Sequence, residues 1–515
     1  MSSIRISRRQ ALAGSAALVS SLAMPGLSRA AGRPVLTHGV QSGDVAHDGA
    51  VIWARADREA NMVVEWSTSE SFANAQVVQP LSVGDPTDFT GKLVLQGLPS
   101  DQDIFYRVTM NDLSDNTPSA PVTGHFRTAP GGLRDVSFVW SGDTAGQGWG
   151  IDDSRGGMTT YRTMLGHRPD FMIHSGDTVY ADGPMKPEVE LKDGTVWKNL
   201  LVEEKTKVAE TLQEFRAQYL YNMLDQNVRA FNAEVPVLYQ WDDHEVLNNW
   251  YPNEILASDD RYAEKSVRKL AARSARAFHE MYPIRRSAAE PRRVYRKVSY
   301  GPLLDIFFLD MRSYRGDNGA NDQPEGAPFL GAEQLEWLKR ALTASQATWK
   351  VFAADMPLGM IVYDNWREKN TFENSSNGDG PVLGREADIA DLLAFVKHAG
   401  VKNTVWLTAD VHYTAAHHYS PERAEFQDFE PFWEFVSGPL HAGTFGPNDY
   451  DNTFGVEVKY AKHPSKEQGI NLPPSEGLQF FGKVDIAAAS GVMTVRLMDS
   501  ADKELWSVDL EPKLG

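Results

Sequence analysis

The sequence contains no cysteine among its 515 residues. This absence excludes structural disulfides and thiolate metal ligands. Basic residues are also fewer than acidic ones: the chain has 51 Lys and Arg against 69 Asp and Glu, and its formal net charge is −18. Duplex binding depends on cationic side chains that neutralise phosphates. The charge balance therefore argues against a nucleic-acid partner, although a local anion site remains compatible with it.

The N-terminus lacks an uninterrupted apolar run of membrane-spanning length. An uncharged stretch follows three arginines there, but Pro25 interrupts it, and small residues precede a predicted cleavage between Ala30 and Ala31. We expect residues 1–30 to be an export signal and the processed chain to have no membrane span. The run SRRQAL at 7–12 resembles a twin-arginine signal. It predicts twin-arginine export machinery as a partner and a periplasmic or secreted protein.

The length of 515 residues allows about two to four domains. Short strand-like runs alternate with turns over residues 33–130, which predicts an all-β sandwich. The stretch LQGLP at 95–99, followed by YRV at 106–108, resembles a corner of the fibronectin type III module. We assign this sandwich no chemistry.

The pattern changes at residue 133, and the remainder to residue 515 is predicted to be one α/β catalytic domain. A hairpin is expected at 188–198, and a polar, glycine-rich loop at 365–384 has the length of a rim or lid. Buried strands are expected at 136–140, 171–174, 235–240, 303–309, 349–353 and 404–408, helices at 203–234, 260–281, 332–343 and 386–399, and closing strands at 480–486, 492–497 and 506–510.

An aspartate follows each of the six buried strands. Any single one of them has a structural explanation as a turn residue or helix cap. Ligands in open α/β sheets bind at the carboxyl ends of strands, so the set is expected to converge, and cations would relieve its mutual repulsion. The residues are Asp143, Asp177, Asp242 with Asp243, Asp310, Asp355 and Asp410.

Histidine and tyrosine accompany three of these acids, in GDTVY at 176–180, WDDHE at 241–245 and DVH at 410–412. Imidazole and phenolate suit a transition metal better than they suit Ca²⁺. The sequence therefore predicts a mixed-metal centre.

These motifs resemble the calcineurin-like metallophosphatase superfamily. The runs at 241–250, 309–312 and 409–412 more closely resemble its alkaline phosphatase D family, over roughly residues 35–510. The resemblance implies that the N-terminal β module is followed along the chain by a sandwich of two sheets flanked by helices. It also implies an exported phosphoesterase that hydrolyses monoesters or diesters by metal-activated water.

The resemblance also implies the metals and their ligands. Members commonly carry a cysteine where this chain has Asp143, and carboxylates replace imidazoles at the second metal, which favours Ca²⁺ there. The implied centre holds Fe³⁺ and Ca²⁺, with Asp177 shared between the two ions. The implied ligands are Asp143, Asp177, Tyr180 and His412 for iron, and Asp243, Asp355 and Asp410 for the second ion, with Asn248 and Asn249 as further oxygen donors.

Two further side chains are candidates for catalysis. His244 follows a predicted metal ligand and is placed to steer the phosphate or protonate the leaving group; its alternative is a core histidine satisfied by hydrogen bonds. Arg312, like Arg315, offers planar donors for phosphate oxygens, although a salt bridge to one of the many acids is an equal alternative.

Other functions remain open on the sequence alone. The substrate is expected to be a small-molecule or lipid phosphate ester, and a phospholipase D-like phosphodiesterase is the main variant. A non-catalytic, calcium-stabilised surface binding protein is a second alternative, and a hydrolase of another bond type is a third. His244 and Tyr180 favour the enzyme over the calcium-stabilised binding protein, because a structural Ca²⁺ site needs neither an imidazole acid nor a phenolate.

Overall fold

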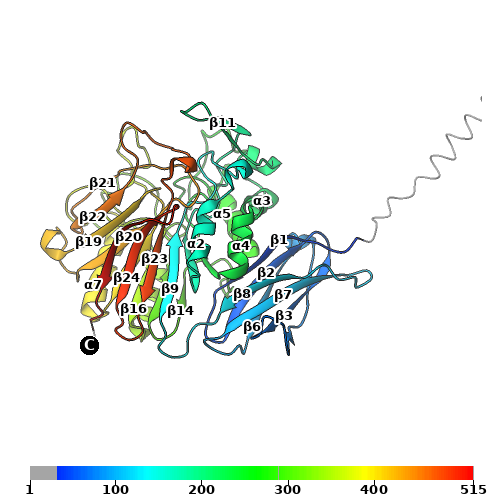
Figure 1. Cartoon of the computed structure of the whole chain (residues 1–515). Helices are drawn as coiled ribbons and strands as arrows, with labels where there is room; N and C mark the ends of the chain where they lie inside the picture. The colour runs from blue at the N-terminus through cyan, green and yellow to red at the C-terminus, as the bar shows by residue number, and fades with distance from the viewer. Residues whose placement is uncertain (1–31, 288, 514–515) are drawn as a thin grey trace, which may run out of the picture.

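A computed structural model describes residues 32–287 and 289–513 of the chain (Figure 1). The export signal predicted at residues 1–30 lies outside these ranges. Within them, no helix combines the length and the apolar character needed to cross a bilayer.

Two antiparallel sheets form the N-terminal module. Their buried side chains, including Ile52 and Leu95 from one sheet and Val64 and Val108 from the other, belong to a shared core. A β structure is thus confirmed here, while its likeness to fibronectin type III stays a prediction. One sheet contains β1 (Leu36–Gly43), β2 (Gly49–Ala56) and β6 (Thr90–Gln96), and the other β3 (Ala60–Ser67), β4 (Gln76–Val77), β5 (Leu81–Val83), β7 (Asp103–Asp112) and β8 (Val122–Arg127).

Two larger mixed sheets build the rest of the molecule. The six-stranded sheet has the order β13-β10-β9-β23-β24-β25, and its first three strands are parallel. The seven-stranded sheet has the order β14-β15-β16-β18-β20-β19-β22, with β15, β16, β18 and β20 parallel. The bounds are β9 (Val136–Ser141), β10 (Phe171–Ser175), β13 (Val237–Gln240), β14 (Arg296–Ser299), β15 (Leu304–Phe308), β16 (Trp349–Ala353), β18 (Thr404–Thr408), β19 (Thr414–Tyr419), β20 (Phe432–Val436), β22 (Val456–Lys462), β23 (Phe480–Ile486), β24 (Met493–Asp499) and β25 (Glu504–Leu510). A short pair, β17 (Met360–Ile361) and β21 (Asp449–Tyr450), lies apart from both.

Successive side chains along a strand point to opposite faces of its sheet, so strands such as β9 and β15 contribute to an inner core between the sheets and to an outer core under the helices. In β9, Phe138 and Trp140 join the core between the two large sheets, whereas Val139 joins a second core with the helices. In β15, Ile306 faces the inner core and Phe307 a third one. Helices α2 (Thr159–Gly166), α3 (Leu212–Asn222), α4 (Gln226–Glu234) and α5 (Val267–Met281) cover the six-stranded sheet, and α6 (Ala332–Ala344) and α7 (Glu386–His398) cover the seven-stranded one. The predicted α/β class is confirmed.

The helix predicted over 203–234 is wrong as a single element. A short 3-10 turn precedes α3, and Asp225 separates α3 from α4 because its carboxylate caps the second helix, accepting from the backbone N–H groups of Asn227 and Val228 at 2.8 and 3.0 Å. The helix predicted from residue 260 begins only at Val267. The hairpin expected at 188–198 is present as β11 (Glu188–Glu190) and β12 (Val196–Lys198).

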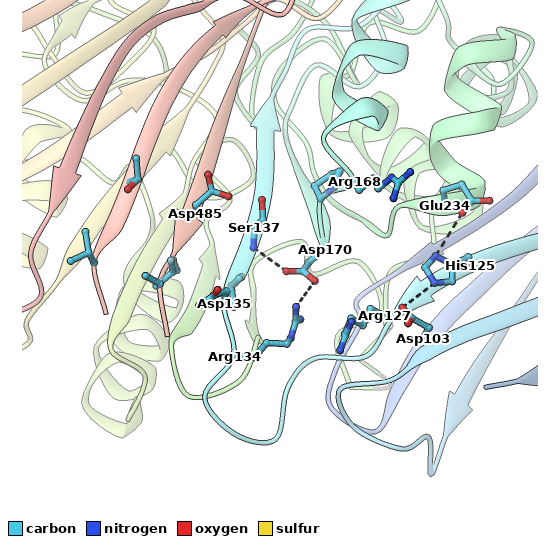
Figure 2. A pocket seen from close by; sticks show the side chains of 16 residues that line it. Asp103, His125, Arg127, Arg134, Asp135, Ser137, Arg168, Asp170, Glu234 and Asp485 are labelled. Atoms are coloured by element: carbon cyan, nitrogen blue, oxygen red, sulfur yellow. Dashed lines mark hydrogen bonds and ion pairs between the residues drawn. The ribbon is translucent and has the colours of Figure 1, made fainter. Parts of the chain in front are cut away.

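The N-terminal module packs directly against the two-sheet part of the molecule. Trp53 is fully buried and donates from Nε1 to the carbonyl of Glu280 at 2.9 Å. Asp44 accepts from Arg296 Nη2 at 2.9 Å. A cleft of about 660 Å³ opens between β8 and the amino end of β9 (Figure 2), and His125 lies there between Asp103 and Glu234. This junction lies at the end of β9 opposite to the loop that carries Asp143.

Candidate metal centre

The predicted ligands lie in loops at the carboxyl ends of parallel strands, and both large sheets contribute. Asp143 follows β9 and Asp177 follows β10 in one sheet, whereas Asp410 and His412 follow β18 in the other. The two sheets meet at this edge, because ligand atoms of Asp143, Asp177 and His412 all lie within 4.8 Å of one another. The convergence expected from the topology is therefore present for most of the set, but Asp310 is outside it and accepts from the backbone N–H groups of Arg312 and Ser313 at 3.0 and 2.9 Å, as a turn residue does.

Tyr180 completes this first group. Its hydroxyl lies 2.7 Å from His412 Nε2, and His412 Nδ1 is hydrogen-bonded to the carbonyl of Gly443. That second bond assigns the proton to Nδ1 and leaves the Nε2 lone pair directed at the group. The four residues that the resemblance implies for iron are thus brought together.

Two further groups adjoin the first. Asp177, Asp243 and His244 form one, and Asp242, Asp243 and Asp410 form the other, each with ligand atoms within 4.8 Å of one another. Asp177 belongs to the first two groups, as a residue shared between two cations must. Asp243 connects the second group to the third.

Asp355 and Asn248, also predicted as ligands, are placed differently. Asp355 Oδ2 accepts from Arg312 Nε at 3.2 Å, while its Oδ1 is buried without a partner. Asn248 lies on the exposed rim, and its backbone N–H donates to Asp182 Oδ2 at 2.9 Å. Asn249 is closer to the groups, since its backbone N–H donates to Asp243 Oδ2 at 2.5 Å.

Four of the predicted ligands have left-handed backbone conformations. The φ angles of Asp143, Asp177, Asp410 and His412 are 65°, 47°, 66° and 59°. Residues other than glycine rarely adopt this region, although aspartate and histidine are enriched there, and such strain gathers at functional sites. The loops therefore hold these four residues in an unfavourable backbone conformation that directs their side chains into the site.

The charge of the centre is unbalanced without cations. Burial raises the pKa values of Asp143, Asp177 and Asp410 well above the usual carboxyl range. Both carboxylate oxygens of Asp143 and one each of Asp243 and Asp355 are buried without a hydrogen-bond partner. Because buried polar atoms are normally paired, and bound cations favour ionised ligands, this oxygen-rich donor set, with the imidazoles of His412 and His244 and one phenol, fits metal ions.

His244 is held by a carboxylate that the sequence analysis missed. Its Nδ1 lies 2.7 Å from Asp182 Oδ1, and its backbone N–H donates to Asp177 Oδ1 at 3.2 Å. Burial opposes protonation of this ring, but the charges of Asp182, Asp243 and Asp177 hold the pKa of His244 well above its ordinary value. The only sequence signal for Asp182 is its position five residues after Asp177.

The predicted contact between Arg312 and phosphate does not agree with the structure. The guanidinium has no exposed surface, and its Nε donates to Asp242 Oδ1 at 2.7 Å. Its Nη1 is paired with Glu373, and Arg315 is also buried, with Nη1 3.8 Å from the same carboxylate. The salt-bridge alternative therefore describes Arg312, whereas Arg315 donates from Nη2 to Asn318 at 3.0 Å and keeps Nε and Nη1 buried without a hydrogen-bond partner.

Two other buried acids at the site carry structural roles. Glu245 accepts from the backbone N–H of Thr178 at 2.6 Å and from that of Asp242 at 2.8 Å, which joins the loops after β10 and β13. Burial raises the pKa of Glu245 to about 7. Glu373 reaches the site from the 365–384 segment. Because residues 373–376 of this segment are buried, its centre is a packed part of the site and not a movable lid.

The sequence profile of PhoD-like phosphatases matches residues 138–497, and that of the N-terminal domain of PhoD-like phosphatases matches residues 20–130. Alkaline phosphatase D of Bacillus subtilis (strain 168) is 28% identical over 446 residues, which span 81% of this chain and 71% of that protein.

Solved structures share the fold. The structure of PhoD superposes with a TM-score of 0.67 at 21% identity, covering 92% of this chain and 89% of the other. Purple acid phosphatase PPD1 from yellow lupin (Lupinus luteus) seeds gives a TM-score of 0.55 at 13% identity, covering 93% and 74%. With the family profile matched over more than half of its length, the chain belongs to the PhoD-like phosphatase family and is a phosphoric ester hydrolase.

Proposed function

We propose that this protein is an exported phosphoesterase that hydrolyses phosphate monoesters or diesters at a centre of Fe³⁺ and Ca²⁺. The observation that carries the proposal is the convergence of Asp143, Asp177, Tyr180 and His412 on one point, with Asp243 beside it. Asp177 joins both groups, which is the arrangement that a two-metal site requires.

The donor chemistry supports this assignment of metals. Asp143, Asp177, Tyr180 and His412 supply oxygen with one nitrogen, a set that suits Fe³⁺, whereas Asp243 and Asp410 supply only carboxylate oxygen, which suits Ca²⁺. Bound cations would acidify a water molecule and offset the charge that develops on the phosphoryl group.

The protein's own side chains then have distinct tasks. His244 protonates the departing oxygen, and Asp182 orients its ring through Nδ1. Glu245 fixes the loops that carry Asp177 and Asp243. Arg312 holds buried carboxylates in place without contacting the substrate.

The cellular context of the proposal rests on the sequence. The arginine-rich N-terminus predicts twin-arginine export, removal of residues 1–30 and a periplasmic or secreted location, with no stable nucleic-acid partner. We further propose that residues 33–130 form a fibronectin III-like module and residues 133–515 the catalytic domain.

Substitution at the site tests the catalytic proposal. We expect His244→Ala, Asp177→Asn and Asp410→Asn each to reduce hydrolysis of p-nitrophenyl phosphate by about 100-fold or more. Asp391→Asn, the same change at an exposed carboxylate of α7, is the matched control and should have full activity. Activity that survives all three changes would show that the site is elsewhere.

Metal analysis tests the cofactor proposal. The purified protein should contain iron and calcium, and tyrosinate bound to Fe³⁺ should give a visible charge-transfer band. Chelation should abolish activity, and return of Ca²⁺ to the iron-loaded protein should restore it. Full activity in a protein shown to contain no metal would end the proposal.

A substrate panel distinguishes the remaining alternatives. A monoester, a bis-p-nitrophenyl diester and phosphatidylcholine separate a phosphomonoesterase from a phospholipase D-like phosphodiesterase. No hydrolysis of any ester by the metal-loaded protein would instead favour a calcium-stabilised binding protein.

A further inference from the structure

A buried ion-pair network lies directly behind the metal centre and is centred on Glu373. This carboxylate is only 1% exposed and faces Arg312 Nη1 and, at 3.8 Å, Arg315 Nη1. Arg385 lies alongside, and its side chain is 1% exposed. The network is outside the set of predicted ligands, yet it binds two of the carboxylates at the site, those of Asp242 and Asp355, through Arg312.

The backbone around Glu373 is held on both sides. Its N–H donates to the carbonyl of Val362 at 2.9 Å, and its own carbonyl accepts from Arg385 Nη1 at 2.7 Å. The same guanidinium donates from Nη2 to the carbonyls of Gly316 and Asp317 at 2.9 and 2.8 Å. Arg385 thereby joins two segments and places the Glu373 carboxylate at a set position.

Arg312 lies between Glu373 and the carboxylates that follow three strands. Its Nε donates to Asp242 at 2.7 Å and to Asp355 at 3.2 Å. The next distances are longer, since Nη2 lies 3.7 Å from Asp410 Oδ1 and 3.9 Å from Asp243 Oδ1. The guanidinium is thus bound to two of these acids and stops short of the other two.

This distribution decides which carboxylates remain available to a cation. A buried guanidinium and a divalent cation compete for the same oxygens, and the opposing charge of Glu373 reduces the attraction of Arg312 for the acids on its other side. Asp243 and Asp410 form a group of potential ligands together with Asp242, whose Oδ1 already accepts from Arg312, whereas Asp355 belongs to none of the three groups found in the described residues.

We propose that Glu373 is a positioning residue for the second metal ion. It balances the charge of Arg312 from the side opposite Asp242 and Asp355 and so leaves Asp243 and Asp410 to bind Ca²⁺; this inference rests on the proposed function. It also assigns Asp355 to Arg312 rather than to the metal. Glu373 acts through Arg312 and touches neither substrate nor cation.

Calcium titration of the iron-loaded, calcium-depleted holoenzyme tests the inference. We expect Glu373→Gln to weaken Ca²⁺ binding by about 10- to 100-fold, the usual effect of removing a partner of a ligand-holding residue. Iron content and the visible band should stay unchanged, and activity should recover at high calcium concentration. Glu368→Gln, the same change at an exposed residue of the same segment, should bind Ca²⁺ like the wild type.

Two further variants separate positioning from packing. The double variant R312Q/E373Q has no guanidinium to compete and should bind Ca²⁺ at least about tenfold more tightly than E373Q. Glu373→Asp keeps the charge and should fall between the wild type and E373Q, and it serves for the titration if E373Q does not fold.

The outcomes are distinguishable from failure of the proposed function. Wild-type protein that binds neither iron nor calcium contradicts the proposed centre itself. Wild-type protein that binds calcium while E373Q and E373D bind it equally well overturns only the role of Glu373, as does a double variant no tighter than E373Q.

Discussion

Asp182 determines what the His244 imidazole can do, because it accepts from Nδ1 at 2.7 Å and is itself nearly buried. Asp182→Asn keeps an oxygen for this bond but removes the charge that stabilises the imidazolium. We expect kcat for p-nitrophenyl phosphate to fall by about 10- to 100-fold with KM little changed. Steady-state kinetics on protein of unchanged metal content is the measurement, and an unaltered kcat would contradict the orienting role.

Residues of the site divide into those that the sequence could predict and those that it could not. Asp143, Asp177 and His412 follow buried strands at short spacing, so topology alone brings them together. Asp182 and Glu373 act through side-chain contacts across distant segments, which have no local signature. The sequence does not identify the acids that pair with Arg312 for the same reason, since it contains many acids and the pairing depends on contacts between distant segments.

At the level of elements, α7 begins with a buried acid. Burial, together with the charge of nearby Asp451, raises the pKa of Glu386 from 4.5 to about 8. Because the folded pKa lies above the unfolded one, the folded state holds this proton more tightly. The group's contribution to stability is therefore full below pH 4.5 and is lost as the pH rises toward 8.

Glu386→Gln removes this dependence, since the amide does not ionise. We expect the variant to unfold at a Tm higher than that of the wild type by roughly 2 °C or more at about pH 9, and at a similar temperature at about pH 5. Glu336→Gln, the same change at an exposed position of α6, should leave the Tm unchanged at both values. A Tm difference that is equal at both pH values would show that Glu386 does not titrate in this way.

The elements themselves followed from the sequence where periodicity was strong. The six buried runs of the catalytic part are all strands, because each must lie between two apolar layers. The helix predicted at 203–234 failed because Asp225 caps a new helix, and the spacing of apolar residues continues across that break.

For the whole molecule, the unpaired buried carboxylates make stability depend on cations. The metal-free protein should unfold at a lower Tm, and divalent cation at about 1,000 times its Kd should stabilise the native state by about 4 kcal/mol. Thermal unfolding with and without chelator measures this. Asp410→Asn should reduce the calcium-dependent gain, and an equal Tm in the presence and absence of metal would contradict the prediction.

The N-terminal module and the catalytic part should unfold together. Trp53 is fully buried against α5, so Trp53→Ala is expected to destabilise the protein by about 3–5 kcal/mol. Calorimetry should show one transition displaced to lower temperature. A new, separate transition with the main one unmoved would show that the module is thermally independent.

The junction in Figure 2 has a practical consequence for orientation on a support. Strand β8 lies beside the amino end of β9, whereas Asp143 follows its carboxyl end, so the module sits away from the reactive edge. Strands β4 and β5 are edge strands of this module and carry the exposed residues Val77 and Leu81. Enzyme tethered through these strands would present its carboxylate-rich edge outward, open to substrates that are large or themselves immobilised.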